Sequence, residues 1–258
     1  MTDRTDPLAR FRLDGRVAVV VGGGNGIGRA TAALLAAAGA RVAVADRDAD
    51  AARASAAALP GGSAHPLDVA EAAAIDRTFD AIAAEHGRLD ILVNSAGIAI
   101  RHAAVEQPLG DWEKVVAVNM TGTFLCARAA ARHMIARGEG GAIVNLASIM
   151  GISGGGLYPN ISYQTTKGAV VNMTRALAIE WAKQQIRVNA VAPTWVRTQF
   201  IAALTSRPEL VAEIERVTPL GRLAEPEEVA AAILFLVSPA AAMVTGHVLA
   251  VDGGFLAQ

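Results

Sequence analysis

A tyrosine and a lysine stand four residues apart in the segment Ser162-Tyr163-Gln164-Thr165-Thr166-Lys167. Residues at this spacing lie one turn apart on the same face of a helix. A tyrosine hydroxyl has a pKa of about 10 and is a poor base at neutral pH, but a nearby ammonium group favours the phenolate. The pair therefore suits general acid–base chemistry on an alcohol or a ketone. A core tyrosine beside a solvated lysine would show the same spacing, so the pair needs support from the rest of the chain.

A glycine-rich segment, Gly22 to Gly28 (GGGNGIG), follows a β-branched run and precedes a segment rich in alanine and leucine. This strand–turn–helix context is the one that a dinucleotide-binding turn requires. Glycines let a pyrophosphate approach the backbone, and the helix N-terminus offers free N–H groups and a positive dipole end. We expect Gly22, Asn25, Gly26, Ile27 and Gly28 to bind the cofactor; a purely structural glycine turn is the alternative.

Asp46 ends the second expected strand, 18 residues after Gly28. A carboxylate there can accept hydrogen bonds from the ribose diol of an adenosine. The same carboxylate would oppose the 2′-phosphate of NADP, at a cost of about 1–4 kcal/mol for charges about 4 Å apart. Arg47 could offset this charge, although we expect it to point to solvent. The cofactor predicted is NAD; a loop aspartate or a helix cap is the alternative for Asp46.

Composition excludes several classes of protein. A net charge of −1 without a basic block argues against a nucleic-acid partner. The single cysteine, Cys126, excludes an internal disulfide, and its apolar neighbours predict a buried structural thiol in a reducing compartment. The N-terminal segment has no apolar signal region, and no uninterrupted apolar run is long enough to span a membrane. We therefore expect a cytoplasmic protein without a membrane partner.

Alternating strands and helices must position these residues. Strands are expected at 16–21, 41–45, around 65–67, 90–93, 142–146, 187–192 and 247–251, and helices at 29–38, 49–59, 68–86, 112–137, 163–183 and 226–236. This alternation predicts α/β architecture: a single doubly wound Rossmann-type domain over 1–258, with a parallel sheet of about seven strands flanked by helices. A polar arm is expected at about 1–12 and a substrate lid at about 194–220.

The glycine turn, Asp46 and the Tyr163/Lys167 pair stand in an order that resembles the short-chain dehydrogenase/reductase (SDR) family. The resemblance extends from Leu13 to Phe255. It includes Asp68-Val69, Asn94-Ser95-Ala96-Gly97, Asn119, Ser148, Pro193 to Thr198, and Val251-Asp252-Gly253-Gly254. The resemblance implies an oxidoreductase that acts on a CH–OH group by hydride transfer.

The resemblance also implies a role for each catalytic residue. Tyr163 would be the acid/base, and Lys167 would lower its pKa and hold the nicotinamide ribose. Ser148 would hydrogen-bond the substrate oxygen, and Asn119 would anchor a water linking Lys167 to solvent. Each role suits the hydrogen-bonding capacity of its side chain.

Further cofactor contacts follow from the same resemblance. Asp68 and Val69 would contact the adenine of the cofactor. The adenosine side would be lined by Asn94, Ala96 and Gly97. The carboxamide and the phosphates would lie beside Pro193, Val196 and Thr198. Asp68 is expected to cap a helix in either case, and Val69 and Val196 could merely pack. The chain departs from the family pattern at Val21, Ser95 and Thr194, and the Ser148–Tyr163 spacing of 15 is two longer than usual.

Three loop segments are expected around the substrate: 98–102, 154–160 and 195–207. The named candidates are Ile98, Gly155, Tyr158, Trp195, Arg197 and Phe200. The alternative is that Trp195 and Phe200 only pack and that Arg197 is solvated; Arg101 and His102 are expected on the surface. The histidines show no metal-ligand spacing, so no catalytic metal is predicted.

The mixed polar and aromatic candidates favour a small sugar, a polyol or another secondary alcohol as substrate. A reductase of acyl-carrier-bound 3-ketones is the alternative enzyme, although Asp46 opposes its usual NADP preference. An NAD-binding sensor without turnover is a further alternative, but it would have no physical need for the complete catalytic set. By resemblance, a homotetramer is expected through 112–137, 163–183 and the C-terminal segment.

Overall fold

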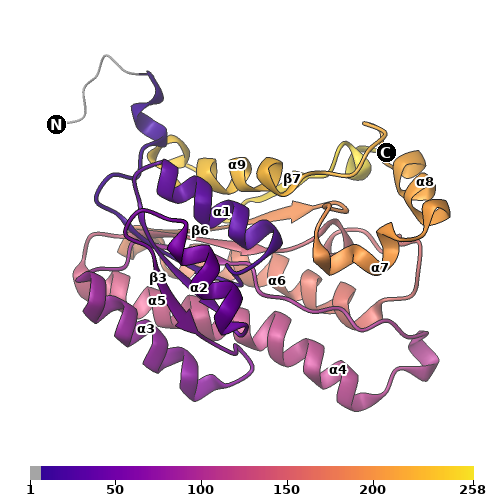
Figure 1. Ribbon diagram of the computed structural model, residues 1–258, viewed down its shortest axis with the longest axis horizontal. Coiled ribbons are helices and arrows are strands. Elements are labelled where there is room, and N and C mark those ends of the chain that lie inside the picture. Colours follow the sequence, from indigo (N-terminus) through magenta and orange to yellow (C-terminus); the bar gives the residue numbers. More distant parts are fainter. Residues whose placement is uncertain (1–6) are drawn as a thin grey trace.

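The computed structural model describes residues 7–258, so the first half of the expected polar arm lies outside the described residues. Seven parallel strands form one sheet in the order β3-β2-β1-β4-β5-β6-β7 (Figure 1). The strands are β1 (Val17–Val21), β2 (Arg41–Asp46), β3 (Ser63–Pro66), β4 (Ile91–Asn94), β5 (Gly141–Leu146), β6 (Ile186–Pro193) and β7 (Val248–Val251). This arrangement confirms the predicted Rossmann-type fold.

Helices cover both faces of the sheet. The helices of the described residues are α1 (Gly26–Ala37), α2 (Ala49–Ala57), α3 (Ala72–His86), α4 (Leu109–Val116), α5 (Thr123–Arg137), α6 (Ile161–Glu180), α7 (Ala202–Thr205), α8 (Pro208–Val217) and α9 (Pro226–Val237). One hydrophobic core joins the sheet to α3, α5 and α6, and a second joins the opposite face to α1, α2 and α9 (Figure 1). Because both faces are covered, β1 and β4 are buried along their whole length, which explains their continuous apolar sequences.

The strand order reverses between β1 and β4, and this reversal fixes where a ligand can bind. In open parallel sheets the crevice outside the carboxyl ends of two such strands is the usual binding site. Here the turn after β1 lies against the loop after β4: a Cβ on Gly22 would lie 2.6 Å from the Ala96 nitrogen, and Gly22 has a φ of 75°. A residue with a side chain at Gly22 would clash with that loop.

Three segments differ from the sequence-based expectation. The expected helix after Asp68 begins only at Ala72, and Asp68 accepts the Ala70 N–H at 2.9 Å instead of capping the helix. The long central helix is interrupted by a π-helical turn at Ala117–Gly122. The expected lid region contains two helices, α7 and α8, that the sequence-based assignment did not include. No helix within residues 7–258 combines the length and the apolar character needed to cross a membrane.

Candidate active site

A cavity of about 390 Å³ lies at the carboxyl ends of the strands and joins the glycine turn to Tyr163. Most of the predicted site residues line it: Gly22, Asn25, Gly26, Ile27, Asp46, Arg47, Asp68, Val69, Ala96, Gly97, Ile98, Ser148, Tyr158, Tyr163, Lys167, Pro193, Trp195, Val196, Thr198 and Phe200. Residues from almost the whole length of the chain thus meet in one space large enough for a small ligand.

Some predicted residues support the cavity from behind. The Asn94 Nδ2 donates to Asn145 Oδ1 at 2.9 Å, a buried bond that ties β4 to β5. At Gly28 a Cβ would lie 2.0 Å from the Gly22 carbonyl oxygen, so this glycine lets α1 pack against the turn. Neither residue lines the cavity.

The structure places Gly155 and Arg197 away from the cavity, contrary to the sequence-based expectation. Gly155 lies in an exposed loop, where its N–H donates to the Ser153 hydroxyl at 3.0 Å. Arg197 donates to the Glu225 carboxylate at 3.0 Å, and 54% of its side chain is exposed. The charge of Arg197 is therefore neutralised at the surface. This position agrees with the alternative interpretation, in which Arg197 is a solvated residue.

Asp46 is held directly beneath the glycine turn. Its Oδ2 accepts the Gly24 N–H at 2.9 Å, and its Oδ1 accepts the Asp48 N–H at 3.0 Å. A Cβ on Gly24 would lie 2.9 Å from the same Oδ2, so only glycine lets the carboxylate sit there. These contacts fix a negative charge at the nucleotide end of the cavity, and Asp48, not Asp46, caps α2.

Tyr163 projects from the first turn of α6 towards the end of β5. Burial raises the pKa of Tyr163 to about 12, while a hydrogen bond from Ser148 and the positive charge of Arg101 act to lower it. The ring packs against Phe200, with 6.0 Å between the ring centroids. Tyr163 and Ser148 therefore present two hydroxyls to the same point of the cavity.

Lys167 lies one turn further along α6 and is 5% exposed. Its Nζ donates to the Leu146 carbonyl at 2.6 Å and lies 5.6 Å from the Tyr163 ring centroid. Burial lowers the pKa of Lys167 to about 8. At Tyr163 burial of the phenol outweighs the hydrogen bond from Ser148 and the charge of Arg101, and the role of Lys167 in lowering the pKa of Tyr163 stays a prediction.

Asn119 lies in the π-helical turn and is completely buried. Its Oδ1 accepts the Ile98 N–H at 2.8 Å, and its Nδ2 donates to the Ile98 carbonyl at 2.9 Å and to the Thr166 hydroxyl at 3.2 Å. The amide therefore clamps the loop after β4 against α6. Its role in anchoring a water beside Lys167 stays a prediction.

Comparison with known proteins agrees with this geometry. A family model described as Enoyl-(Acyl carrier protein) reductase matches residues 22–256. A short-chain type dehydrogenase/reductase from Mycobacterium marinum has 38% sequence identity and a TM-score of 0.93, with 97% of this chain and 99% of that chain covered. The chain belongs to the short-chain dehydrogenase/reductase family.

Relatives within the SDR family include dehydrogenases of sugar alcohols. The D-threitol dehydrogenase of Mycolicibacterium smegmatis is 45% identical over 95% of this chain and 94% of its own length. The galactitol 2-dehydrogenase (L-tagatose-forming) of Cereibacter sphaeroides is 52% identical, over 65% of each chain. Some of the similar solved structures hold NADP.

Three residues of this SDR cavity carry polar atoms that sequence reasoning did not single out. Arg101, expected on the surface, lines the cavity instead, together with Asn160 and Thr194. Each has a buried polar atom without a hydrogen-bond partner: Arg101 Nε, Asn160 Oδ1 and Thr194 Oγ1. Arg101 and Asn160 lie in two of the segments expected around the substrate, but nothing in their residue types distinguished them from ordinary loop residues.

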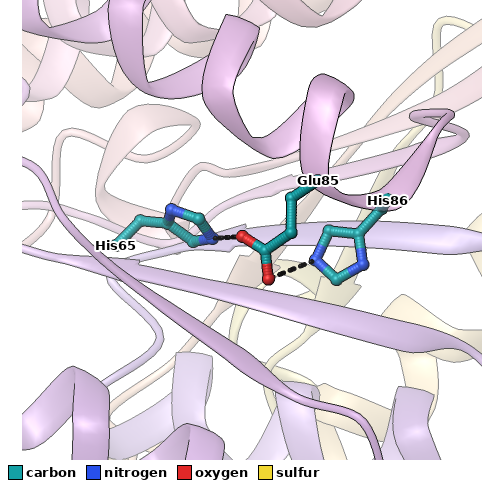
Figure 2. Close-up of side chains that lie close together, drawn as sticks. All are labelled: His65, Glu85 and His86. Atoms are coloured by element: carbon teal, nitrogen blue, oxygen red, sulfur yellow. Dashed lines mark ion pairs between the residues drawn. The ribbon is translucent and has the colours of Figure 1, made fainter.

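A second group of polar residues lies outside the SDR cavity. His65 on β3 meets Glu85 and His86 at the end of α3, with one possible ligand atom from each residue within 4.8 Å of the others (Figure 2). The Ser63 hydroxyl lies 2.9 Å from His65 Nε2 and 2.8 Å from His86 Nε2. The histidines thus do cluster, which their separation in the sequence concealed. None of the four lines the cavity, and the absence of a catalytic metal stays a prediction.

Proposed function

We propose that this protein is an NAD(H)-dependent dehydrogenase that interconverts a secondary alcohol of the polyol or sugar class and its ketone. The observation that carries the proposal is the meeting of Ser148, Tyr163 and Lys167 with the glycine turn and Asp46 in one cavity. NAD, when bound there, would accept or supply the hydride. The rest of the chemistry belongs to the side chains of this chain.

Tyr163 moves the proton. In ketone reduction the carbonyl carbon gains a hydride and its oxygen gains the phenolic proton, so the phenol is the acid; in alcohol oxidation the phenolate takes the hydroxyl proton back. Because the pKa of Tyr163 is about 12, the residue is protonated at neutral pH and suits reduction. Alkaline pH favours oxidation because it raises the fraction of phenolate.

Ser148 and Lys167 complete the acid–base machinery. Ser148 donates to the same oxygen that Tyr163 protonates, which orients the reacting carbon and stabilises charge that develops on that oxygen. Lys167 has a pKa of about 8, close to neutrality, so it can pass a proton towards the phenolate. Its bond to the Leu146 carbonyl holds the ammonium in place during this exchange.

Asp46 supports NAD over NADP as the physiological cofactor. Its carboxylate lines the cavity under the glycine turn, where a 2′-phosphate would bring a second negative charge close to it. Arg47 lines the same end but is exposed, so its charge is screened by solvent. The ribose diol, in contrast, can donate to the carboxylate.

A reductase of acyl-carrier-bound 3-ketones is the second candidate. The matching family model is described as an enoyl-(acyl carrier protein) reductase, which shares the acyl-carrier substrate but reduces a C=C bond and not a ketone. The two candidates differ in cofactor and in substrate. An acyl substrate would also need an apolar path for its chain. Met150, Trp195 and Phe200 give the cavity apolar walls, while Arg101, Asn160 and Thr194 add polar atoms that an acyl chain would leave unpaired.

The decisive assay follows the absorbance of reduced nicotinamide at alkaline pH. Purified protein receives NAD or NADP with galactitol, threitol, a simple secondary alcohol or a 3-hydroxyacyl thioester. Turnover with NAD and a polyol or secondary alcohol is the expected result. Turnover only with NADP and the thioester would transfer the assignment to the acyl reductase. Tight NAD binding without turnover of any alcohol would support a sensor.

We further propose a cytoplasmic homotetramer with one domain per chain and a lid at about 194–220. Apolar side chains on α5 and α6 are left uncovered: Phe124 is 39% exposed and Ile179 is 80% exposed. Burying such residues between copies of the chain would stabilise an assembly. Light scattering should give the mass of four chains, and a monomer mass would contradict the proposal.

A further inference from the structure

Arg101 brings a positive charge to the cavity that no acidic side chain neutralises within the part of the chain that the structure describes. No carboxylate in residues 7–258 lies within ion-pair distance of Arg101. The neighbouring residue, His102, pairs with Asp111 at 3.2 Å, and Lys114 takes the other oxygen of that carboxylate at 3.0 Å. The guanidinium lies over the Tyr158 ring, with Cζ 4.9 Å from the ring centroid.

The backbone holds this charge in a defined place. Asn119 clamps both polar groups of Ile98, and the Ser162 hydroxyl donates to the Ile100 carbonyl at 3.4 Å. The Tyr158 ring under the guanidinium is itself fixed, because its hydroxyl accepts the Trp195 Nε1–H at 3.1 Å. The stacked face of the guanidinium is covered, which leaves its N–H edges for a ligand.

Polar atoms without partners line the same cavity. Buried polar groups are nearly always hydrogen-bonded, because an unpaired one loses its contacts with water without compensation. Arg101 Nε, Asn160 Oδ1 and Thr194 Oγ1 are buried without a partner, and all three residues line the cavity. A cationic donor, an amide and a hydroxyl in one cavity match a ligand that carries both an anion and hydroxyl groups.

We propose that Arg101 binds a carboxylate of the substrate, so that the preferred substrate is a polyhydroxy acid, an aldonate or related sugar acid, and not the neutral polyol. The guanidinium edge suits a carboxylate because it can donate two parallel hydrogen bonds. Asn160 and Thr194 then meet hydroxyls of the same chain of carbons. This inference rests on the proposed function, since it names the substrate class of that site.

Matched pairs of substrates test the proposal directly. Galactonate and galactitol share a carbon chain, as do threonate and threitol, and the members of each pair differ mainly in one terminal carboxylate. The wild type should show kcat/KM about 10- to 100-fold higher for the acid of each pair. Arg101→Met should remove this preference for the acid, and Arg101→Lys should retain part of it. His102→Gln, the matched control, should leave the preference unchanged.

The ratio separates carboxylate binding from an effect on the acid/base. The charge of Arg101 also lowers the pKa of Tyr163, so Arg101→Met should slow both members of a pair through that route. Only carboxylate binding makes the loss of kcat/KM larger for the acid than for the polyol. A wild type that prefers the polyol, or an equal loss for acid and polyol in Arg101→Met, would overturn the inference.

A binding measurement tests the carboxylate site separately from the proposed dehydrogenase reaction. Calorimetry on the wild-type protein with NADH compares tartrate with threitol, which share four carbons and two central hydroxyls. If no alcohol is turned over, tartrate binding that Arg101→Met weakens about tenfold or more still supports the carboxylate site. Equal or undetectable binding of tartrate by both proteins would refute it.

Discussion

Asp46→Asn removes the negative charge at the nucleotide end of the cavity with almost no change in side-chain size. Both carboxylate oxygens are in use, with Oδ2 accepting from Gly24 and Oδ1 from Asp48. An asparagine has one acceptor oxygen and an NH₂ group, so only one of these two bonds can persist. Losing the other costs about 0.5–1.5 kcal/mol of stability, and the folded protein should remain available for kinetics.

The magnitude of the cofactor effect follows from charge repulsion. A 2′-phosphate about 4 Å from the Asp46 carboxylate costs about 1–4 kcal/mol at effective dielectric constants between about 80 and 20. Removing the carboxylate charge removes this cost for NADP. The value of kcat/KM for NADP should therefore rise about 5- to 1,000-fold. Efficiency with NAD itself should fall about tenfold, because a neutral amide replaces a charged acceptor for the ribose diol.

The assay measures initial rates of nicotinamide reduction with each cofactor at a fixed, saturating alcohol. Asp50→Asn is the matched control, since Asp50 is exposed, pairs with Arg53 and does not line the cavity. The control should leave the cofactor ratio unchanged. If the cofactor ratio of Asp46→Asn changes by less than about threefold, the assignment of Asp46 to the ribose is refuted. If Asp50→Asn raises the ratio as much as Asp46→Asn does, the effect is due to the overall charge of the protein and not to Asp46.

Three other substitutions probe separate parts of the molecule. Tyr163→Phe should lower kcat by about 10²- to 10⁴-fold while calorimetry shows NAD binding unchanged; retained turnover would exclude the phenol as the acid/base. Gly28→Ala should lower Tm, because its Cβ would lie 2.0 Å from a carbonyl oxygen, whereas Gly110→Ala, with nothing within 4 Å, should not. Burial lowers the pKa of His65 below 6.5, although the charge of Glu85 opposes this shift. The neutral form of His65 therefore stabilises the fold above pH 6.5. This stabilisation is lost as the pH falls through the pKa of the folded state. Chemical denaturation across that range should show the loss, and His65→Gln should flatten it; an unchanged slope would contradict the assignment.

Local sequence patterns predicted most strands and helices, because parallel strands covered on both faces read as continuous apolar runs. The ends of helices that side-chain hydrogen bonds determine were harder to predict from the sequence. Asp68 looked like a helix cap, but its carboxylate closes a turn on Ala70 and the helix begins later. The π-helical turn around Asn119 was also missed, since hydrophobic periodicity does not distinguish a widened turn from a regular one.

The sequence by itself predicted the acid–base pair and the glycine turn for the cofactor. Tyr163 and Lys167 are one helical turn apart and the glycine turn is continuous in the chain, so both are local features that order and spacing reveal. The tertiary structure alone decided which loop side chains line the cavity. Arg101 and Arg197 are both arginines in loops near the cavity, yet Glu225 neutralises Arg197 at the surface and Arg101 lines the cavity beside Tyr158. The physical reason is that the fate of a loop charge depends on partners far away in sequence. The same holds for His65 and His86, whose meeting depends on how β3 packs beside α3 (Figure 2).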